Sequence, residues 1–144
     1  MALELYMLGL VVQDMETSLA FYRRLGLAIP EGSEAMTHVE IKMGSGLTFF
    51  LDSRPKRWDP QFVRSDTQAS NPAANNYGSV LEFYLQTQAE VETKYNELIG
   101  FGYQGYRAPY ATSFGMCFAM LKDPDDNTIL LSGVLPASET PPTS

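Results

Sequence analysis

The sequence predicts an α+β fold built from two copies of one βαβββ unit. Leu8 to Leu27 has the pattern of a strand, a tight turn and a short helix, and Val80 to Tyr103 repeats it. An offset of 73 residues relates the first strand and helix of the two copies and places Asp14 and Thr87 at equivalent positions before the two helices. An internal repeat of this kind indicates duplication of a supersecondary unit.

The first repeat covers about residues 3–53 and opens with an apolar strand over 5–12. Asp14 is the expected N-cap of the helix that follows, and Gly26 is its expected stop. The remaining expected elements are a short strand and turn near Ile29 and Pro30, an alternating strand over 36–43, a turn at 44–46 and a returning strand over 47–53.

The second repeat covers about residues 79–134 and opens with a strand over 80–85. Thr87 and Glu90 have the spacing of a capping box, and Gly100 is expected to end the helix. The remaining expected elements are a strand with a loop over 103–113, a strand over 114–121, the turn KDPDDN and a last strand over 128–134.

The two repeats are joined by an inter-repeat loop at about 54–78, rich in Pro, Asn, Ser and Asp. Long segments of this kind inside a compact domain are either functional or disordered. Trp58 indicates that part of this one packs. The polar residues 135–144 are expected to form a mobile tail. We therefore expect one domain over 1–134.

Composition restricts the class of protein. The 144 residues carry a net charge of −7 and no basic stripe, which argues against nucleic-acid and anionic-membrane partners. Cys117 is the single cysteine and lies in an apolar run, as a buried structural thiol does. No apolar run approaches the roughly 18 residues that span a bilayer. Residues 1–6 lack the basic cluster of a signal peptide, so we expect a cytoplasmic protein.

The repeat, with DMETSLAFYRRLGL after the first strand and KDPDDNTILL before the last, resembles the vicinal-oxygen-chelate superfamily. That superfamily includes glyoxalase I, extradiol dioxygenases and bleomycin-resistance proteins. Within it, the chain is most similar to the mitomycin-resistance, antibiotic-binding branch. The segments that carry this similarity are LVVQDMETSLAFYRRLGLAIPEG, THVEIKMG, WDP, YNELIGFGYQG and FAMLKDPDDN. The resemblance implies a curved mixed sheet with helices on the outer face, a concave ligand cup and a homodimer. Where the family's turn is usually DPDGN, Asp126 replaces Gly, and Asp tolerates a left-handed backbone.

The resemblance also identifies four positions that decide whether the cup holds a metal. In the enzymes of the superfamily, His or Glu side chains hold it, and their positions correspond here to Met7, Phe49, Val80 and Leu130. All four are apolar, whereas a divalent metal needs several nitrogen, oxygen or thiolate ligands. We therefore expect no metal and no other cofactor.

Several side chains have two interpretations that the sequence leaves open. His38 is either a rim residue bonded to backbone or an imidazole that stacks on a planar ligand. Tyr110 and Phe114 either cover the edge of the core or form one plate of an aromatic sandwich, which the resemblance favours. Trp58 either anchors the inter-repeat loop or closes the pocket mouth. The candidate ligand-binding residues are Met7, His38, Phe49, Trp58, Val80, Glu82, Tyr84, Tyr106, Tyr110, Phe114, Met116 and Leu130.

These observations favour a metal-free binding protein that sequesters a planar or aromatic small molecule, as in antibiotic resistance or self-protection. One alternative is a cofactor-independent enzyme that uses Glu82 or His38 as a general base. A further alternative is a vestigial member with a structural role. A Ser–His–Asp arrangement has no support, because nothing ties the single histidine to a nucleophile.

Overall fold

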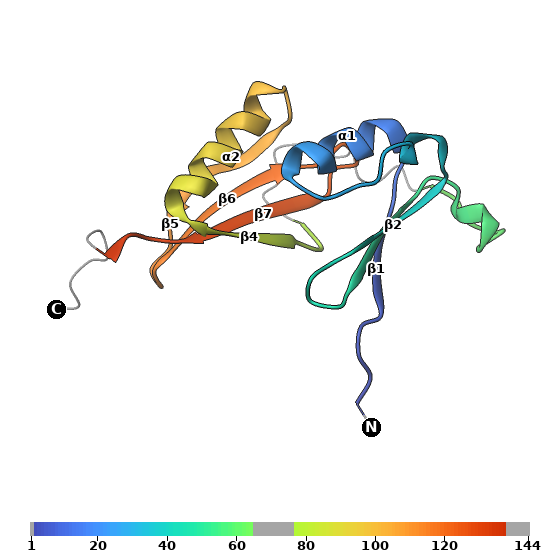
Figure 1. Ribbon diagram of the computed structural model, residues 1–144, viewed down its shortest axis with the longest axis horizontal. Helices are drawn as coiled ribbons and strands as arrows, with labels where there is room; N and C mark the ends of the chain where they lie inside the picture. The colour runs from blue at the N-terminus through green and yellow to red at the C-terminus, as the bar shows by residue number, and fades with distance from the viewer. Residues whose placement is uncertain (1, 65–76, 138–144) are drawn as a thin grey trace. The chain divides into compact units, whose positions relative to one another are not determined.

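The computed structural model describes residues 2–64 and 77–137. The chain forms two compact units, residues 1–72 and 73–144, and each contains one long helix and one mixed sheet (Figure 1). The predicted α+β class with a duplicated unit is therefore confirmed. Residues 65–76 of the expected inter-repeat loop and residues 138–144 of the expected tail lie outside the described residues.

The first unit contains three strands and the helix α1. The strands are β1 (Met7–Val11), β2 (His38–Lys42) and β3 (Thr48–Asp52), in the spatial order β1-β3-β2. β1 runs parallel to β3, and β2 runs antiparallel to it. A short 3₁₀ helix, η2 (Pro55–Arg57), follows β3.

α1 (Met15–Leu25) begins and ends where the sequence predicts. A side-chain oxygen of Asp14 accepts a hydrogen bond from the Thr17 backbone N–H at 3.2 Å. Gly26, with φ of 129°, ends the helix in a conformation that a residue with a Cβ rarely adopts. The buried side of α1 includes Phe21 and Tyr22, which hold it in the core.

The short strand expected near Ile29 and Pro30 is absent from the described chain. The Ser33 hydroxyl donates to the Pro30 carbonyl at 2.7 Å, and Gly32 takes the left-handed conformation with φ of 84°. These features bend the backbone into the 3₁₀ helix η1 (Ser33–Ala35) instead of extending it. The first repeat therefore has two strands after its helix.

The second unit has the full predicted order. Its elements are β4 (Leu81–Thr87), α2 (Gln88–Gly100), β5 (Gly105–Ala111), β6 (Met116–Lys122) and β7 (Thr128–Val134). The strands lie in the order β4-β7-β6-β5, with β4 parallel to β7 and the other pairs antiparallel. α2 lies across one face of this sheet and contacts all four strands (Figure 1).

The cap of α2 and the last turn also confirm the sequence predictions. The Glu90 backbone N–H donates to the Thr87 hydroxyl oxygen at 3.2 Å, as a capping box requires. In the KDPDDN turn, Asp126 has φ of 70°, the left-handed conformation that its Gly-like position predicts. Asp123 Oδ1 stabilises the turn by accepting from the backbone N–H groups of Asp125 and Asn127.

Gly105 shows which face of the second sheet meets α2. A Cβ atom at Gly105 would collide with the Tyr95 hydroxyl and Ile99 on α2, so that face of β5 meets the helix without a gap. Gly105 pairs with Leu121, which pairs with Ile129, so these residues also face α2. The alternate positions of each strand form the opposite sheet face.

Within residues 2–64 and 77–137, no helix combines the length and the apolar character that crossing a bilayer demands.

Candidate functional site

Five residues share one face of the first unit's sheet. His38 on β2 pairs with Asp52 on β3, and Glu40 pairs with Phe50. Gly9 on β1 also pairs with Phe50 from the other side. Because directly paired residues lie on the same face of a sheet, their side chains come together there.

The expected place of Phe49 on this face is wrong. Phe49 is buried, and its ring centroid lies 5.5 Å from that of Tyr22 on α1. It pairs with Ile41, which the alternation of β2 places toward the helix. Phe49 is therefore part of the helix-facing core, and its neighbour Phe50 lies on the other face.

The strand register explains this error. Leu8 pairs with Phe49 in the first unit, as Leu81 pairs with Ile129 in the second. Phe49 is thus the equivalent of Ile129, one residue before Leu130. The first-unit equivalent of Leu130 is Phe50.

His38 is held between two carboxylates. Its Nδ1 lies 2.8 Å from Asp52 Oδ2, and its Nε2 lies 3.0 Å from Glu40 Oε2. The imidazole is thus bonded to side chains of its own sheet, and not to backbone as its rim interpretation proposed. Its orientation is fixed at both ring nitrogens.

Asp52 is the buried centre of this network, and the sequence interpretation did not single it out. Only 2% of the residue is exposed. Besides His38, its carboxylate accepts from the Arg54 backbone N–H at 2.7 Å and from Trp58 Nε1 at 3.2 Å. Asp52 therefore connects β2, β3 and the start and end of η2.

The two carboxylates raise the pKa of His38 above its ordinary 6.5, with the Glu40 hydrogen bond the larger cause, the Asp52 hydrogen bond next, and burial opposing both. For Asp52, burial alone would raise the pKa of the carboxyl. The hydrogen bonds from His38, the Arg54 N–H and Trp58 together outweigh burial and hold that pKa below its ordinary 3.8. The imidazolium and the carboxylate thus stabilise each other's charged form.

Phe50 provides an aromatic surface beside His38. The two ring centroids are 5.0 Å apart with an interplanar angle of 33°. The Phe50 ring also lies across Gly9, where a Cβ atom would collide with it. The absence of a side chain at Gly9 therefore lets this ring lie against the β1 backbone.

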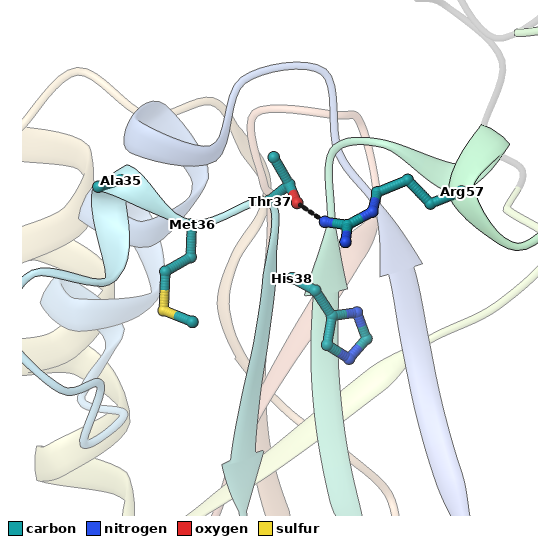
Figure 2. A pocket seen from close by; sticks show the side chains of 5 residues that line it. All are labelled: Ala35, Met36, Thr37, His38 and Arg57. Carbon is teal, nitrogen blue, oxygen red and sulfur yellow. Dashed lines mark hydrogen bonds between the residues drawn. The ribbon is translucent and has the colours of Figure 1, made fainter.

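A shallow, open hollow adjoins His38 (Figure 2). The Arg57 guanidinium reaches back from η2 and donates to the Thr37 hydroxyl at 2.8 Å. The residues that line the hollow are Ala35, Met36, Thr37, His38 and Arg57. Apolar side chains and polar groups therefore line this hollow together with the His38 ring.

The second unit also presents an aromatic row, on the sheet face opposite α2. Strand pairing aligns Tyr84 on β4, Ser132 on β7, Phe118 on β6 and Tyr110 on β5. Phe114 adds to this row, since its ring centroid lies 5.7 Å from that of Phe118. Tyr110 packs edge-on against Phe118 at 6.1 Å.

The row explains the placement of several predicted residues. Tyr84, Tyr110 and Phe114 are all exposed and lie on or beside one sheet face. Phe118 joins them and was missed, because an aromatic residue in an apolar strand reads equally well as core. Phe118 pairs with Ser132 on β7, and strand alternation had already placed Ser132 on the same face as Leu130. This pairing is what identifies Phe118 as part of the face.

The next row on the same face contains Glu82, Leu130 and Met120. Glu82 is exposed, whereas Leu130 is buried. Val80 precedes β4 and is exposed, Met116 opens β6 half-buried, and Met7 opens β1 half-buried. The structure therefore places Glu82 and Leu130 beside the aromatic row of the second unit.

The four metal-ligand positions of the resemblance do not fit a metal. With the corrected register they are Met7, Phe50, Val80 and Leu130. Hydrocarbon side chains and one thioether offer a divalent cation no suitable ligand set. Among residues 2–64 and 77–137, no group of three or more His, Cys, Asp or Glu side chains is arranged to hold a metal ion.

Cys117 is buried on β6 with a free thiol. Burial raises the pKa of this thiol, and the charge of Glu92 raises it further. A buried thiol with a raised pKa is a poor nucleophile. The expected structural role of Cys117 fits this environment.

Residues 5–131 match the family model of the Glyoxalase/Bleomycin resistance protein/Dioxygenase superfamily, and the chain belongs to that superfamily. The predicted family is thus confirmed at this level. No curated protein matches the chain.

Solved structures share the fold at low sequence identity. A glyoxalase/bleomycin resistance protein/dioxygenase family enzyme from Burkholderia phytofirmans is 20% identical, with a TM-score of 0.70 over 92% of this chain and 100% of that chain. A glyoxalase-related enzyme from Fulvimarina pelagi is 18% identical, with a TM-score of 0.70 over 90% of this chain and 87% of that chain. A lactoylglutathione lyase from Agrobacterium tumefaciens is 20% identical, with a TM-score of 0.61 over 90% of this chain and 92% of that chain.

Proposed function

We propose that this protein binds a planar aromatic small molecule without a metal ion and acts by sequestering it. Resistance to, or self-protection from, an antibiotic is the biological role that this function implies. The superfamily contains both enzymes and resistance proteins, so membership alone does not choose between them. The residues at the candidate ligand-binding faces support the binding function.

The observation that carries the proposal is the pair of rings formed by Phe50 and His38. Buried Asp52 fixes His38 through its Nδ1, and Gly9 leaves room for the Phe50 ring against β1. Two ring side chains held against each other bind another ring at little cost in side-chain entropy. Offset stacking adds about 0.5–1.5 kcal/mol for each such contact beyond the burial of area.

The second unit supports the same function with its own aromatic face. Tyr84, Tyr110 and Phe114 are large, exposed side chains on a sheet face that α2 does not cover. Exposed aromatic groups that gather on one face are typical of a binding surface. Apolar surface with a few placed polar groups is the usual composition of small-molecule sites.

Binding can be measured through Trp58, the single tryptophan of the chain. Its indole N–H donates to Asp52, so its fluorescence reports on the His38 network. Titration with a panel of planar aromatic compounds, in buffer with EDTA, should give saturable quenching for at least one class. Phe50→Leu should weaken that binding about tenfold, whereas the control Phe62→Leu, on the chain after η2, should not.

Saturable binding that Phe50→Leu leaves unchanged would contradict the assigned surface. Binding that appears only after a divalent metal is added would contradict the metal-free function itself. His38→Gln provides an independent check, because it keeps a hydrogen-bonding side chain and removes the ring.

One alternative function has an observation in its favour. Asp52 fixes Nδ1 of His38 and leaves Nε2 facing only exposed Glu40, the geometry that orients a histidine for proton transfer. A cofactor-independent enzyme would use His38 in this way. Mass spectrometry of the bound aromatic compound after long incubation separates the two functions: recovery of unchanged ligand supports sequestration, and a converted product supports the enzyme.

We propose that the protein is a homodimer. The segment before β1 exposes Leu3, Leu5 and Tyr6, three large apolar side chains in close succession. Apolar residues exposed together in this way are typical of a surface that a partner covers. Sedimentation of the intact chain and of a Leu3→Ser, Leu5→Ser variant tests this, and a monomeric intact chain would exclude it.

A further inference from the structure

Lys122 at the end of β6 is a charged side chain with an unusual environment. The residue is only 8% exposed, although lysine is almost never buried unless it is paired. It pairs with Thr128 across β6 and β7, and so lies on the sheet face opposite α2, as the aromatic row does. Met120 and Phe118 follow it along the same face of β6.

The partners of the Lys122 ammonium are all uncharged. Nζ donates to the Thr128 hydroxyl at 2.8 Å and lies 4.6 Å from the centroid of the Tyr106 ring. None of the ion pairs among residues 2–64 and 77–137 includes Lys122. A buried charge without a counter-ion is costly, and the ring and hydroxyl offset only part of that cost.

Tyr106 adds a second donor without a partner. Its hydroxyl is buried and has no hydrogen-bond partner among the described residues, while the rest of the side chain is partly exposed. The Lys122 ammonium and the Tyr106 hydroxyl are therefore two hydrogen-bond donors at the same ring, and an acceptor that binds there could accept from both. A carboxylate has two oxygens that can accept from both, and its charge neutralises the lysine.

We propose that Lys122 and Tyr106 bind the acidic group of the ligand, which is therefore a planar aromatic anion such as an aromatic carboxylate. This inference rests on the proposed function and assigns the chemical class of the ligand that the second unit's own aromatic face binds. The aromatic row around Phe118 contacts the ring system, and Lys122 contacts the acid further along the same strand. Lys122 lies four positions after Phe118 on β6, about 13 Å along the strand, so the ligand is elongated or carries its acid on a short chain.

The chain provides a matched pair of variants for the test. Lys122→Met removes the charge and keeps an unbranched side chain of similar reach. Lys94→Met makes the same charge change on α2, where Lys94 is paired with Glu97 at 2.8 Å. Tyr106→Phe removes the unpartnered hydroxyl and keeps the ring under Lys122. Circular dichroism melts of each variant confirm that it is folded.

The probes are 2-naphthylacetate and 2-naphthylacetamide, which have the same ring and side chain and differ in charge. Calorimetry should show that the intact protein binds the acid at least about tenfold more tightly than the amide. Lys122→Met should abolish this preference without weakening the amide, and Tyr106→Phe should reduce it several-fold. Lys94→Met should preserve it.

Three outcomes overturn the proposal, and they differ in what else fails. If the amide binds as tightly as the acid, the proposed function stands and the anionic ligand class is wrong. If folded Lys122→Met retains the preference for the acid, another cation holds it and the assigned residues are wrong. If neither probe nor any other planar aromatic compound binds, the proposed function fails and this inference fails with it.

Discussion

At the scale of single residues, the first unit depends on Asp52. A buried carboxylate at this position fixes an imidazole, an indole and the N–H that starts η2. Each bond alone is modest, but each removes a donor that would otherwise be left without a partner. The sequence interpretation treated Asp52 only as part of the strand expected over 47–53. Only the pairing of β2 with β3 reveals that it faces His38.

Asp52→Asn should cost about 2 kcal/mol of unfolding free energy, because a neutral amide satisfies the surrounding donors less well than a carboxylate. It should also lower the pKa of His38 toward 6.5. His38 is the only histidine, so a single NMR titration curve reports this pKa directly. An unchanged pKa would show that Glu40 alone sets it.

The pH dependence of stability follows from the same pair. The pKa of His38 is raised in the folded protein, so its contribution is complete below 6.5 and is lost as pH rises through the folded pKa. The pKa of Asp52 is lowered, so its contribution is complete above 3.8 and is lost as pH falls through its folded pKa. Urea midpoints should therefore be highest between these values. His38→Gln should flatten the alkaline decline, and an equal decline in that variant would assign it to another group.

Gly9 offers a test of the aromatic surface. Gly9→Ala adds a methyl group where the Phe50 ring lies, so the ring must move and its contact with His38 changes. Because a side chain can yield more easily than backbone, we expect a stability loss of about 1 kcal/mol but a clear loss of ligand affinity. Gly44→Ala is the control, since nothing lies within 4 Å of its Cβ position. Equal affinity in both variants would exclude Phe50 from the site.

At the scale of elements, local chemistry made the helices predictable. Asp14, Gly26 and Thr87 act within a few residues of themselves, and the structure places each cap where the sequence predicts it. The register of β1 with β3 was not predictable to one residue, because hydrophobic residues stand on both sides of the correct position. Phe49 and Phe50 are identical in chemistry, and only the pairing of strands shows which of them faces the core and which lies on the candidate binding face.

The Thr87 cap can be tested by itself. Thr87→Ala should destabilise the protein by about 1 kcal/mol, because the Glu90 N–H loses its acceptor at the start of α2. Thr87→Ser keeps the hydroxyl and should recover most of that loss. The measurement is the free energy of unfolding in urea. A cost as large for serine as for alanine would show that the methyl group matters more than the cap.

At the scale of the whole molecule, the duplicated unit was predictable from the sequence. The chemistry of the two sheet faces that lie away from the helices was predictable only in part. Apolar residues at the metal-ligand positions were visible in the sequence, and the corrected register replaces one phenylalanine by another. The His38–Asp52 pair and the Lys122–Tyr106 pair join residues from different strands. The spacing of the two residues along the chain does not predict the contact in either pair.

The central claim is metal-independent binding of a planar aromatic ligand, and thermal unfolding tests it most directly. With EDTA present, a ligand at about 100 times its dissociation constant should add about 2.7 kcal/mol, several degrees for a chain of this size. Divalent metals alone should add nothing. Stabilisation by an aromatic compound in EDTA is the result we predict. Stabilisation by a metal that EDTA removes, with none from aromatic compounds, would contradict the account.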